Sequence, residues 1–192
     1  MAGDKSRGYE ALAQRFITSR SPTIGATSVR DWSRALPRGA SVLDLGCGSG
    51  IPVSAVLTAE GFEVYAVDAS ATLIETYRRR FPAAHVECGA AEDSTFFDRR
   101  FDGIVAWGLM FLLPADIQRD VIGKAARALA PGGRFLFTSG AVADVWHDAM
   151  TGGESISLGA EEYRAILRDA GLTVEDEMSD EGENYYYSAR NE

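Results

Sequence analysis

The sequence predicts a three-layer α/β domain in which helices cover both faces of a mostly parallel seven-stranded sheet, with an antiparallel last strand. Short apolar runs alternate with helical segments after Gly39, and this alternation is typical of parallel strands joined by crossover helices. Only residues 179–182 separate the last two apolar runs, so these two strands can pair only antiparallel. With 192 residues, 46% of them hydrophobic, the chain suffices for one domain with a sizeable core.

The segment over residues 1–39 is expected to be helical and to precede the domain over residues 40–192. Apolar residues at steps of three and four predict its first helix: Tyr9, Leu12, Ala13, Phe16 and Ile17. A loop over residues 19–25 follows. A second helix is expected over residues 27–36, and Pro37 ends it.

Within the domain, strands and helices are expected to alternate. Strands are predicted over residues 42–45, 63–67, 85–88, 101–107, 134–138, 172–177 and 183–189. Helices are predicted over residues 52–60, from a Ser70 cap to Arg80, over residues 115–129, and through Tyr163 to Leu167. A stretch with several glycines and serines, residues 151–159, leads into the last of these helices.

Charge and composition narrow the classes of partner. The formal net charge of -9 repels phosphate backbones, so nucleic acid is not an expected partner. No apolar run approaches the roughly 20 residues of a membrane-spanning helix, and the polar start lacks an apolar signal region. We therefore expect a cytoplasmic protein. The two cysteines, Cys47 and Cys88, have no partner pattern, so we expect reduced thiols and no bound metal.

The strongest local motif lies where the first predicted strand meets the following helix. It reads Leu43-Asp44-Leu45-Gly46-Cys47-Gly48-Ser49-Gly50. Glycines at this position let the backbone turn sharply and let a ligand approach closely. A pyrophosphate-binding loop usually reads G-x-G-x-x-G, whereas this loop reads G-x-G-x-G and has a carboxylate, Asp44, two residues before the first glycine. That carboxylate repels a pyrophosphate and attracts an ammonium group.

The motif, together with Asp68 after the second strand, resembles the class I, Rossmann-like S-adenosylmethionine-dependent methyltransferases. Asp68 lies 18 residues beyond Gly50, where a carboxylate accepts ribose hydroxyls. Residues 101–106 resemble the fourth-strand motif of this family, and residues 129–135 resemble its turn into the fifth strand. The resemblance covers roughly residues 9–189. It implies S-adenosylmethionine as the methyl donor, S-adenosylhomocysteine as a product, and a small-molecule acceptor.

The resemblance also implies which residues bind the donor. The turn from Gly46 through Cys47 and Gly48 to Gly50 would line its methionine and ribose parts. Asp44 would face the amino end, directly or through water, and Asp68 with Ala69 would hold the ribose. Many relatives place an acid at the position of Ala90 to bind adenine. Here Glu92, or a backbone carbonyl near Ala91, is the expected substitute.

Acceptor contacts are expected just past the fourth strand, because ligands of open parallel sheets bind beyond the carboxyl ends of the strands. Trp107, Met110 and Phe111 lie there, and Trp107 could also contact the donor sulfonium. The alternative is that this apolar loop only packs against the sheet. His147, which follows the fifth strand, is the candidate catalytic base, and an ordinary packed or exposed histidine is the alternative.

The amino-terminal helix is a candidate lid over the donor, with Tyr9 and Arg20 reaching its methionine end and Arg20 pairing with the carboxylate. The alternative is a helix that only covers the edge of the sheet. Two other functions remain open from the sequence: an NAD(P)-dependent oxidoreductase, against which the loop spacing argues, and a non-catalytic S-adenosylmethionine-binding protein. A monomer or a homodimer is expected.

Overall fold

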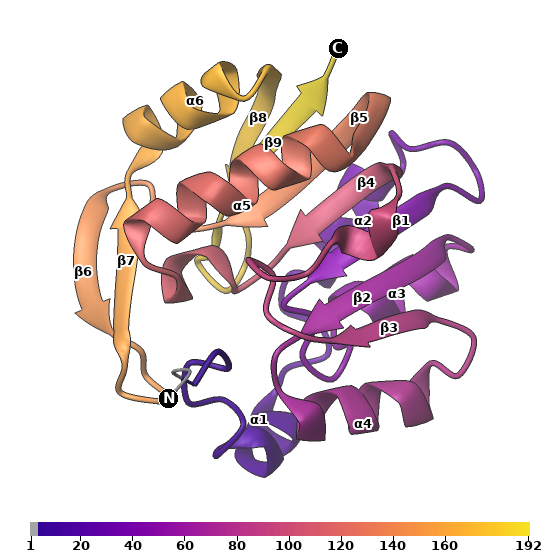
Figure 1. The fold of residues 1–192 in the computed structure, drawn as a ribbon, viewed down its shortest axis with the longest axis vertical. Coiled ribbons are helices and arrows are strands. Elements are labelled where there is room, and N and C mark those ends of the chain that lie inside the picture. Colours follow the sequence, from indigo (N-terminus) through magenta and orange to yellow (C-terminus); the bar gives the residue numbers. More distant parts are fainter. Residues whose placement is uncertain (1–3) are drawn as a thin grey trace.

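The computed structural model describes residues 4–192 and has a seven-stranded sheet at its centre (Figure 1). The strands, in chain order, are β1 (Ser41–Leu45), β2 (Glu63–Asp68), β3 (His85–Cys88), β4 (Phe101–Ala106), β5 (Leu129–Thr138), β8 (Leu172–Ser179) and β9 (Tyr185–Asn191). Their order across the sheet is β3-β2-β1-β4-β5-β9-β8. The last strand, β9, runs antiparallel to both of its neighbours, β5 and β8, which confirms the predicted topology.

Helices cover both faces of this sheet, so the predicted three-layer arrangement is confirmed. The helices are α1 (Ala13–Ser19), α2 (Ala26–Ser33), α3 (Val53–Ala59), α4 (Ala71–Arg80), α5 (Ala115–Ala128) and α6 (Ala160–Asp169). Figure 1 shows α5 and α6 in front of the sheet and α2 and α3 behind it. Ser70 caps α4 as predicted, because its hydroxyl accepts a hydrogen bond from the amide of Leu73 at 3.2 Å.

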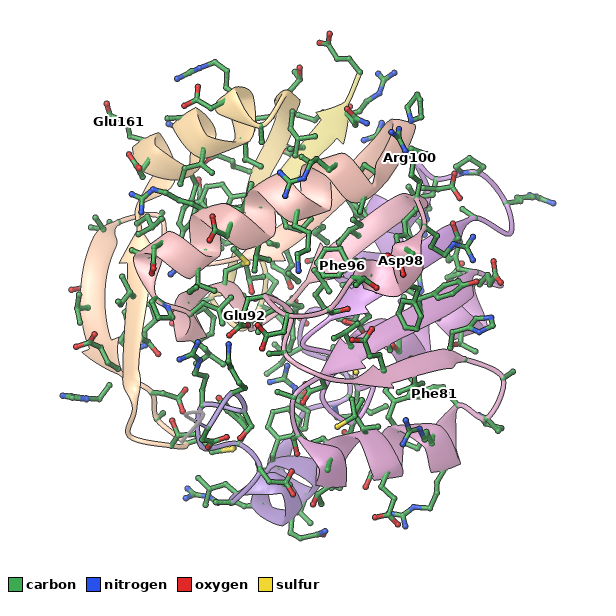
Figure 2. All side chains as sticks on the ribbon, viewed as in Figure 1. Phe81, Glu92, Phe96, Asp98, Arg100 and Glu161 are labelled. Atoms are coloured by element: carbon green, nitrogen blue, oxygen red, sulfur yellow. The ribbon has the colours of Figure 1, made fainter. Side chains whose placement is uncertain are left out.

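Alternation along the strands divides the core between the two faces. Leu43 and Leu45 of β1 pack toward α5, whereas Val42 packs with α2 and α3 on the other face. Both groups of side chains are buried, and each buried aliphatic or aromatic side chain contributes roughly 1.5 to 3 kcal/mol. Figure 2 shows Glu161 pointing outward from α6, whereas Phe96 is buried. No helix within residues 4–192 is long and apolar enough to cross a membrane.

The structure corrects three details of the prediction. Helix α1 begins at Ala13 rather than at Tyr9, since Arg7 and Gly8 take φ angles of 55° and 90° and turn the chain. Strand β5 begins at Leu129 and so includes the Pro-Gly-Gly segment that was predicted as a turn. A separate antiparallel pair, β6 (Ala143–His147) and β7 (Glu154–Leu158), was not predicted. Most of β6 is exposed, so it lacks the alternation of apolar residues that marks a half-buried strand.

Parallel pairing brings three connections to one edge of the sheet. Asp44 of β1 pairs with Ala66 of β2 and with Val105 of β4, so these three strands end at the same level. The residues that follow them are the glycine turn, Ala69 and Trp107. The fold therefore assembles the predicted ligand site from segments that are far apart in the sequence.

Candidate functional site

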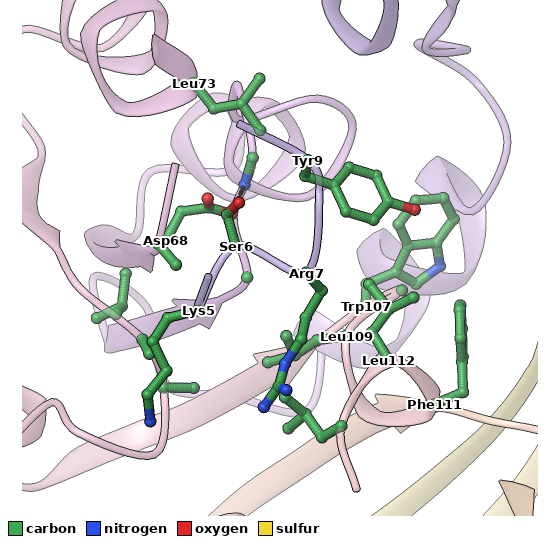
Figure 3. Close-up of a pocket in the computed structure, with 18 of the residues that line it drawn as sticks. Lys5, Ser6, Arg7, Tyr9, Asp68, Leu73, Trp107, Leu109, Phe111 and Leu112 are labelled. Carbon is green, nitrogen blue, oxygen red and sulfur yellow. Dashed lines mark hydrogen bonds between the residues drawn. The ribbon is translucent and has the colours of Figure 1, made fainter. Parts of the chain in front are cut away.

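A cavity of about 240 Å³ opens at this edge of the sheet (Figure 3). Its walls come from the glycine turn, from the connections after β2, β3 and β4, and from the amino-terminal segment. The predicted residues that line it are Tyr9, Arg20, Gly46, Gly48, Asp68, Ala69, Ala91, Glu92, Trp107 and Phe111. Ten of the predicted residues thus line one cavity.

The glycine turn forms the floor of the cavity beneath Phe16. Gly46 and Gly48 have φ angles of 68° and 54°, which residues other than glycine rarely adopt. A Cβ atom on Gly48 would lie 3.0 Å from the ring of Phe16. The amide of Gly46 donates to the carbonyl of Val67 at 2.8 Å, which fixes the turn against β2. A side chain at either glycine would press against a residue that lines the cavity, Leu109 for Gly46 and Phe16 for Gly48.

Asp68 holds the turn and borders the cavity with the same carboxylate. Its Oδ2 accepts a hydrogen bond from the Gly48 amide, and its Oδ1 accepts one from the Ser70 amide, both at 2.8 Å. Burial raises the pKa of Asp68, and the two amide donors oppose that rise. Because each carboxylate oxygen can accept a second hydrogen bond, Asp68 can also bind two neighbouring hydroxyls of a ligand.

Asp44 lies beneath the turn and is buried, so it does not line the cavity directly. Its Oδ2 accepts a hydrogen bond from the Ser54 hydroxyl at 2.6 Å, and Ser54 accepts one from the Tyr77 hydroxyl at 2.8 Å. Burial raises the pKa of Asp44 to about 7, although the Ser54 hydrogen bond lowers it. A cation bound nearby would therefore stabilise the charged form of Asp44.

The amino-terminal segment closes one side of the cavity, and sequence reasoning missed part of it. Lys5, Ser6 and Arg7 line the cavity, and Lys5 and Arg7 form ion pairs with Glu92 at 3.1 and 3.3 Å. Glu10 attaches the segment to α4, because its Oε1 accepts a hydrogen bond from the Thr72 hydroxyl at 2.7 Å. No motif marked these residues, since their partners lie more than 60 positions away.

Arg20 lies above the aromatic wall of the cavity. Its guanidinium carbon is 4.1 Å from the ring centroid of Trp107 and 5.1 Å from that of Phe16. Burial lowers the pKa of Arg20 to about 10, so the side chain stays charged at neutral pH. Trp107 is fixed in turn, because its Nε1 donates a hydrogen bond to the Tyr186 hydroxyl at 2.6 Å. This wall presents a cation and an apolar ring side by side.

Ala90, Ala91 and Glu92 line the opposite end of the cavity. The Lys124 ammonium donates hydrogen bonds to the carbonyls of Ala91 and Glu92 at 3.1 and 2.8 Å. These carbonyls therefore already accept hydrogen bonds from α5, and the Glu92 carboxylate forms ion pairs with the amino-terminal segment. An adenine ring at this end would meet carbonyls that already accept hydrogen bonds from Lys124, and a Glu92 carboxylate that already pairs with Lys5 and Arg7.

Several predicted residues do not reach the cavity. Gly50 packs against Phe81 and Tyr77, and Cys47 is buried beside Ala66 and Ile74. Met110 is fully buried in the core, because the short 3₁₀ turn at Met110–Leu112 directs it inward and leaves Phe111 at the cavity. Met110 is thus not placed to touch an acceptor.

His147 is also absent from the cavity wall. Its ring is exposed at the end of β6, and its Nδ1 lies 3.2 Å from the carbonyl of Gly152. The next residue, Asp148, lines the cavity instead. The catalytic role of His147 stays a prediction that its position does not support.

Comparison with known proteins finds methyltransferases. The family described as "Methyltransferase domain" matches residues 42–133. The chain is 34% identical over 155 residues to 27-O-demethylrifamycin SV methyltransferase of Amycolatopsis mediterranei, covering 73% of the chain and 56% of that enzyme. It is 29% identical over 144 residues to dimethylglycine N-methyltransferase of Parasynechococcus marenigrum, covering 71% of the chain and 49% of that enzyme. The chain thus spans about half the length of these two relatives.

Among solved structures, the CcbJ methyltransferase from Streptomyces caelestis has the same fold. The TM-score is 0.78 at 18% sequence identity, over 99% of each chain. The fold and the family match define a methyltransferase domain with the Rossmann-like sheet of class I. The chain belongs to the S-adenosylmethionine-dependent methyltransferases of this class.

Proposed function

We propose that this protein transfers a methyl group from S-adenosylmethionine to a small-molecule acceptor. The observation that carries the proposal is the position of Asp68, whose carboxylate borders the cavity at the glycine turn. Asp68 would hold the ribose hydroxyls, Gly46 and Gly48 would admit the donor, and Ala90 to Glu92 would face adenine. Arg20 and Tyr9 would face the methionine end. The donor supplies a methyl group that is already activated by a positive sulfur.

The chain itself needs to align the reactants and exclude water, and the cavity is built for both. The amino-terminal segment covers the donor side, and Phe16, Trp107 and Phe111 present apolar surface. A nicotinamide dinucleotide is the less favoured ligand, since the buried Asp44 lies beneath the turn where a pyrophosphate would bind. We further propose a monomer or homodimer that works in the cytoplasm, where free thiols such as Cys47 and Cys88 are usual.

Turnover tests the proposed activity directly. The protein is incubated with S-adenosylmethionine and a panel of amines, phenols and carboxylic acids, and S-adenosylhomocysteine release is measured. We expect release that depends on both the acceptor and the donor. If S-adenosylhomocysteine binds but no acceptor is methylated, the protein is a non-catalytic binding protein instead.

The raised pKa of Asp44 predicts that donor binding releases protons near neutral pH. At pH 7 roughly half of the Asp44 side chains are protonated, and a bound ammonium favours the charged form. We expect up to about half a proton released per S-adenosylhomocysteine bound at pH 7, and less at pH 8, where Asp44 is already mostly ionised. Calorimetry in buffers of different ionisation enthalpy measures this release. Asp44→Asn should abolish it, and an unchanged release in that variant contradicts the assignment.

A further inference from the structure

A carboxylate that the sequence did not indicate lines the cavity on the hairpin whose Trp146 packs against Phe111, with ring centroids 5.6 Å apart. Asp148 directly follows β6, in the turn of the unpredicted hairpin, and lines the cavity with Tyr9, Phe111 and Asn184. The Tyr9 hydroxyl donates a hydrogen bond to Asp148 Oδ2 at 3.2 Å. This contact joins the amino-terminal segment to the hairpin across the opening, 139 residues apart in the sequence.

The two oxygens of Asp148 have different surroundings. Oδ1 accepts three hydrogen bonds inside the turn, from the amides of Met150 and Thr151 at 3.1 and 2.7 Å and from the Thr151 hydroxyl at 2.8 Å. These bonds fix the orientation of the carboxylate. Among the described residues, Oδ2 accepts a hydrogen bond only from the Tyr9 hydroxyl, so one of its lone pairs can accept a further hydrogen bond. Burial and the nearby Asp148 raise the pKa of Tyr9, which keeps that hydroxyl protonated.

The other charged groups around the cavity already have partners. Lys5 and Arg7 pair with Glu92, and Arg20 stacks over Trp107. Within residues 4–192, no Lys, Arg or His nitrogen lies within 4.0 Å of the Asp148 carboxylate. Asp148 is therefore a cavity-lining carboxylate without a cationic partner from the protein. A half-buried carboxylate in this position is best matched by a cation or a strong hydrogen-bond donor from the ligand.

We infer that Asp148 binds the nitrogen of the methyl acceptor, and that the acceptor is an amine with an apolar or aromatic body. This inference rests on the proposed function and deepens it by naming the substrate class. The amine would direct its nitrogen to Asp148 Oδ2, while Phe111 and Leu112 provide an apolar wall for the body. Tyr9 is a positioning residue, because it holds Oδ2 without carrying charge.

The chemistry of transfer to an amine agrees with a carboxylate in this position. An acceptor that binds as an ammonium first loses one proton to solvent, which leaves a neutral amine. The lone pair of this nitrogen then forms the new C–N bond, and the C–S bond breaks with its electron pair passing to sulfur. Positive charge thus moves from sulfur to nitrogen, and the methylated product is an ammonium. Because Asp148 is held beforehand by the turn, it stabilises the charge that develops on nitrogen without having to reorient.

The test compares two probes of matched shape and opposite charge. Phenethylamine and 3-phenylpropanoate are titrated separately into the protein saturated with S-adenosylhomocysteine, and binding is measured by calorimetry. We expect the amine to bind at least about tenfold more tightly than the carboxylate, as one charge-assisted contact provides roughly 1.4 kcal/mol or more. Asp148→Asn should weaken amine binding at least tenfold. That variant keeps Oδ1 for the turn, and thermal unfolding checks that the hairpin persists.

Asp144→Asn is the matched control, because Asp144 lies on the same hairpin, is exposed and does not line the cavity. We expect this variant to bind the amine as the wild type does. The inference is overturned if neither probe binds, if the carboxylate binds as well as the amine, or if Asp148→Asn leaves amine binding unchanged. In each of these cases, the proposed function is still supported if the wild type binds S-adenosylhomocysteine. Failure of the wild type to take up S-adenosylhomocysteine would overturn the proposed function itself.

Discussion

Replacing Asp68 with Asn is expected to weaken S-adenosylhomocysteine binding by roughly 100-fold. A hydrogen bond to a charged group contributes about 1.5 to 3 kcal/mol, and the variant removes the charge that two ribose hydroxyls would share. An amide oxygen still accepts one of the two amide hydrogen bonds, so the glycine turn keeps part of its support. Calorimetry measures the affinity, and urea unfolding measures the stability.

The control for this variant is Asp120→Asn, which removes an exposed carboxylate from α5. We expect it to bind S-adenosylhomocysteine as the wild type does. If Asp68→Asn folds normally and loses less than about threefold in affinity, the carboxylate does not hold the donor. In that case the proposal that Asp68 binds the ribose hydroxyls of the donor is wrong.

Deleting residues 1–20 is expected to cause the second large effect, a loss of donor affinity of more than tenfold. The deletion removes six residues that line the cavity: Lys5, Ser6, Arg7, Tyr9, Phe16 and Arg20. The sheet and its two main cores contain no residue of this segment, so the domain should still unfold cooperatively. Calorimetry with S-adenosylhomocysteine measures the loss, and wild-type affinity in the truncated protein would show that the segment is not a lid.

Glu10→Ala provides a milder version of the same test. Glu10 accepts hydrogen bonds from the Ser70 hydroxyl and from Thr72, and these bonds lower its pKa. The attachment is therefore present at neutral pH and is lost as the pH falls through the lowered pKa. We expect Glu10→Ala to weaken donor binding by less than the deletion does. A loss equal to that of the deletion would mean that this one contact holds the whole segment.

The donor half of the site follows from local sequence. The turn from Gly46 to Gly50 and the carboxylate of Asp68 lie directly after two strands whose apolar runs are plain in the sequence. Parallel pairing then places both at one edge of the sheet, because β1 and β2 end at the same level. Short-range patterns and one topological rule suffice here.

The remaining walls depend on contacts between distant parts of the chain. Lys5 meets Glu92 across 87 positions, and no local pattern indicates such a pair. The hairpin that contains Asp148 is mostly exposed and lacks the alternation from which strands are predicted. The sequence therefore did not indicate Asp148, and the adjacent His147 was predicted as the catalytic base instead. Met110 was misplaced because a 3₁₀ turn, which apolar runs do not specify, decides which side chain faces the cavity.

A direct titration of the wild-type protein with S-adenosylhomocysteine tests the central claim, namely that the glycine turn and Asp68 form a site for a phosphate-free adenosine ligand. Calorimetry should show saturable binding of one molecule per chain, with no comparable binding of NADH or NADPH under the same conditions. Absence of S-adenosylhomocysteine binding together with tight binding of either dinucleotide would contradict the account.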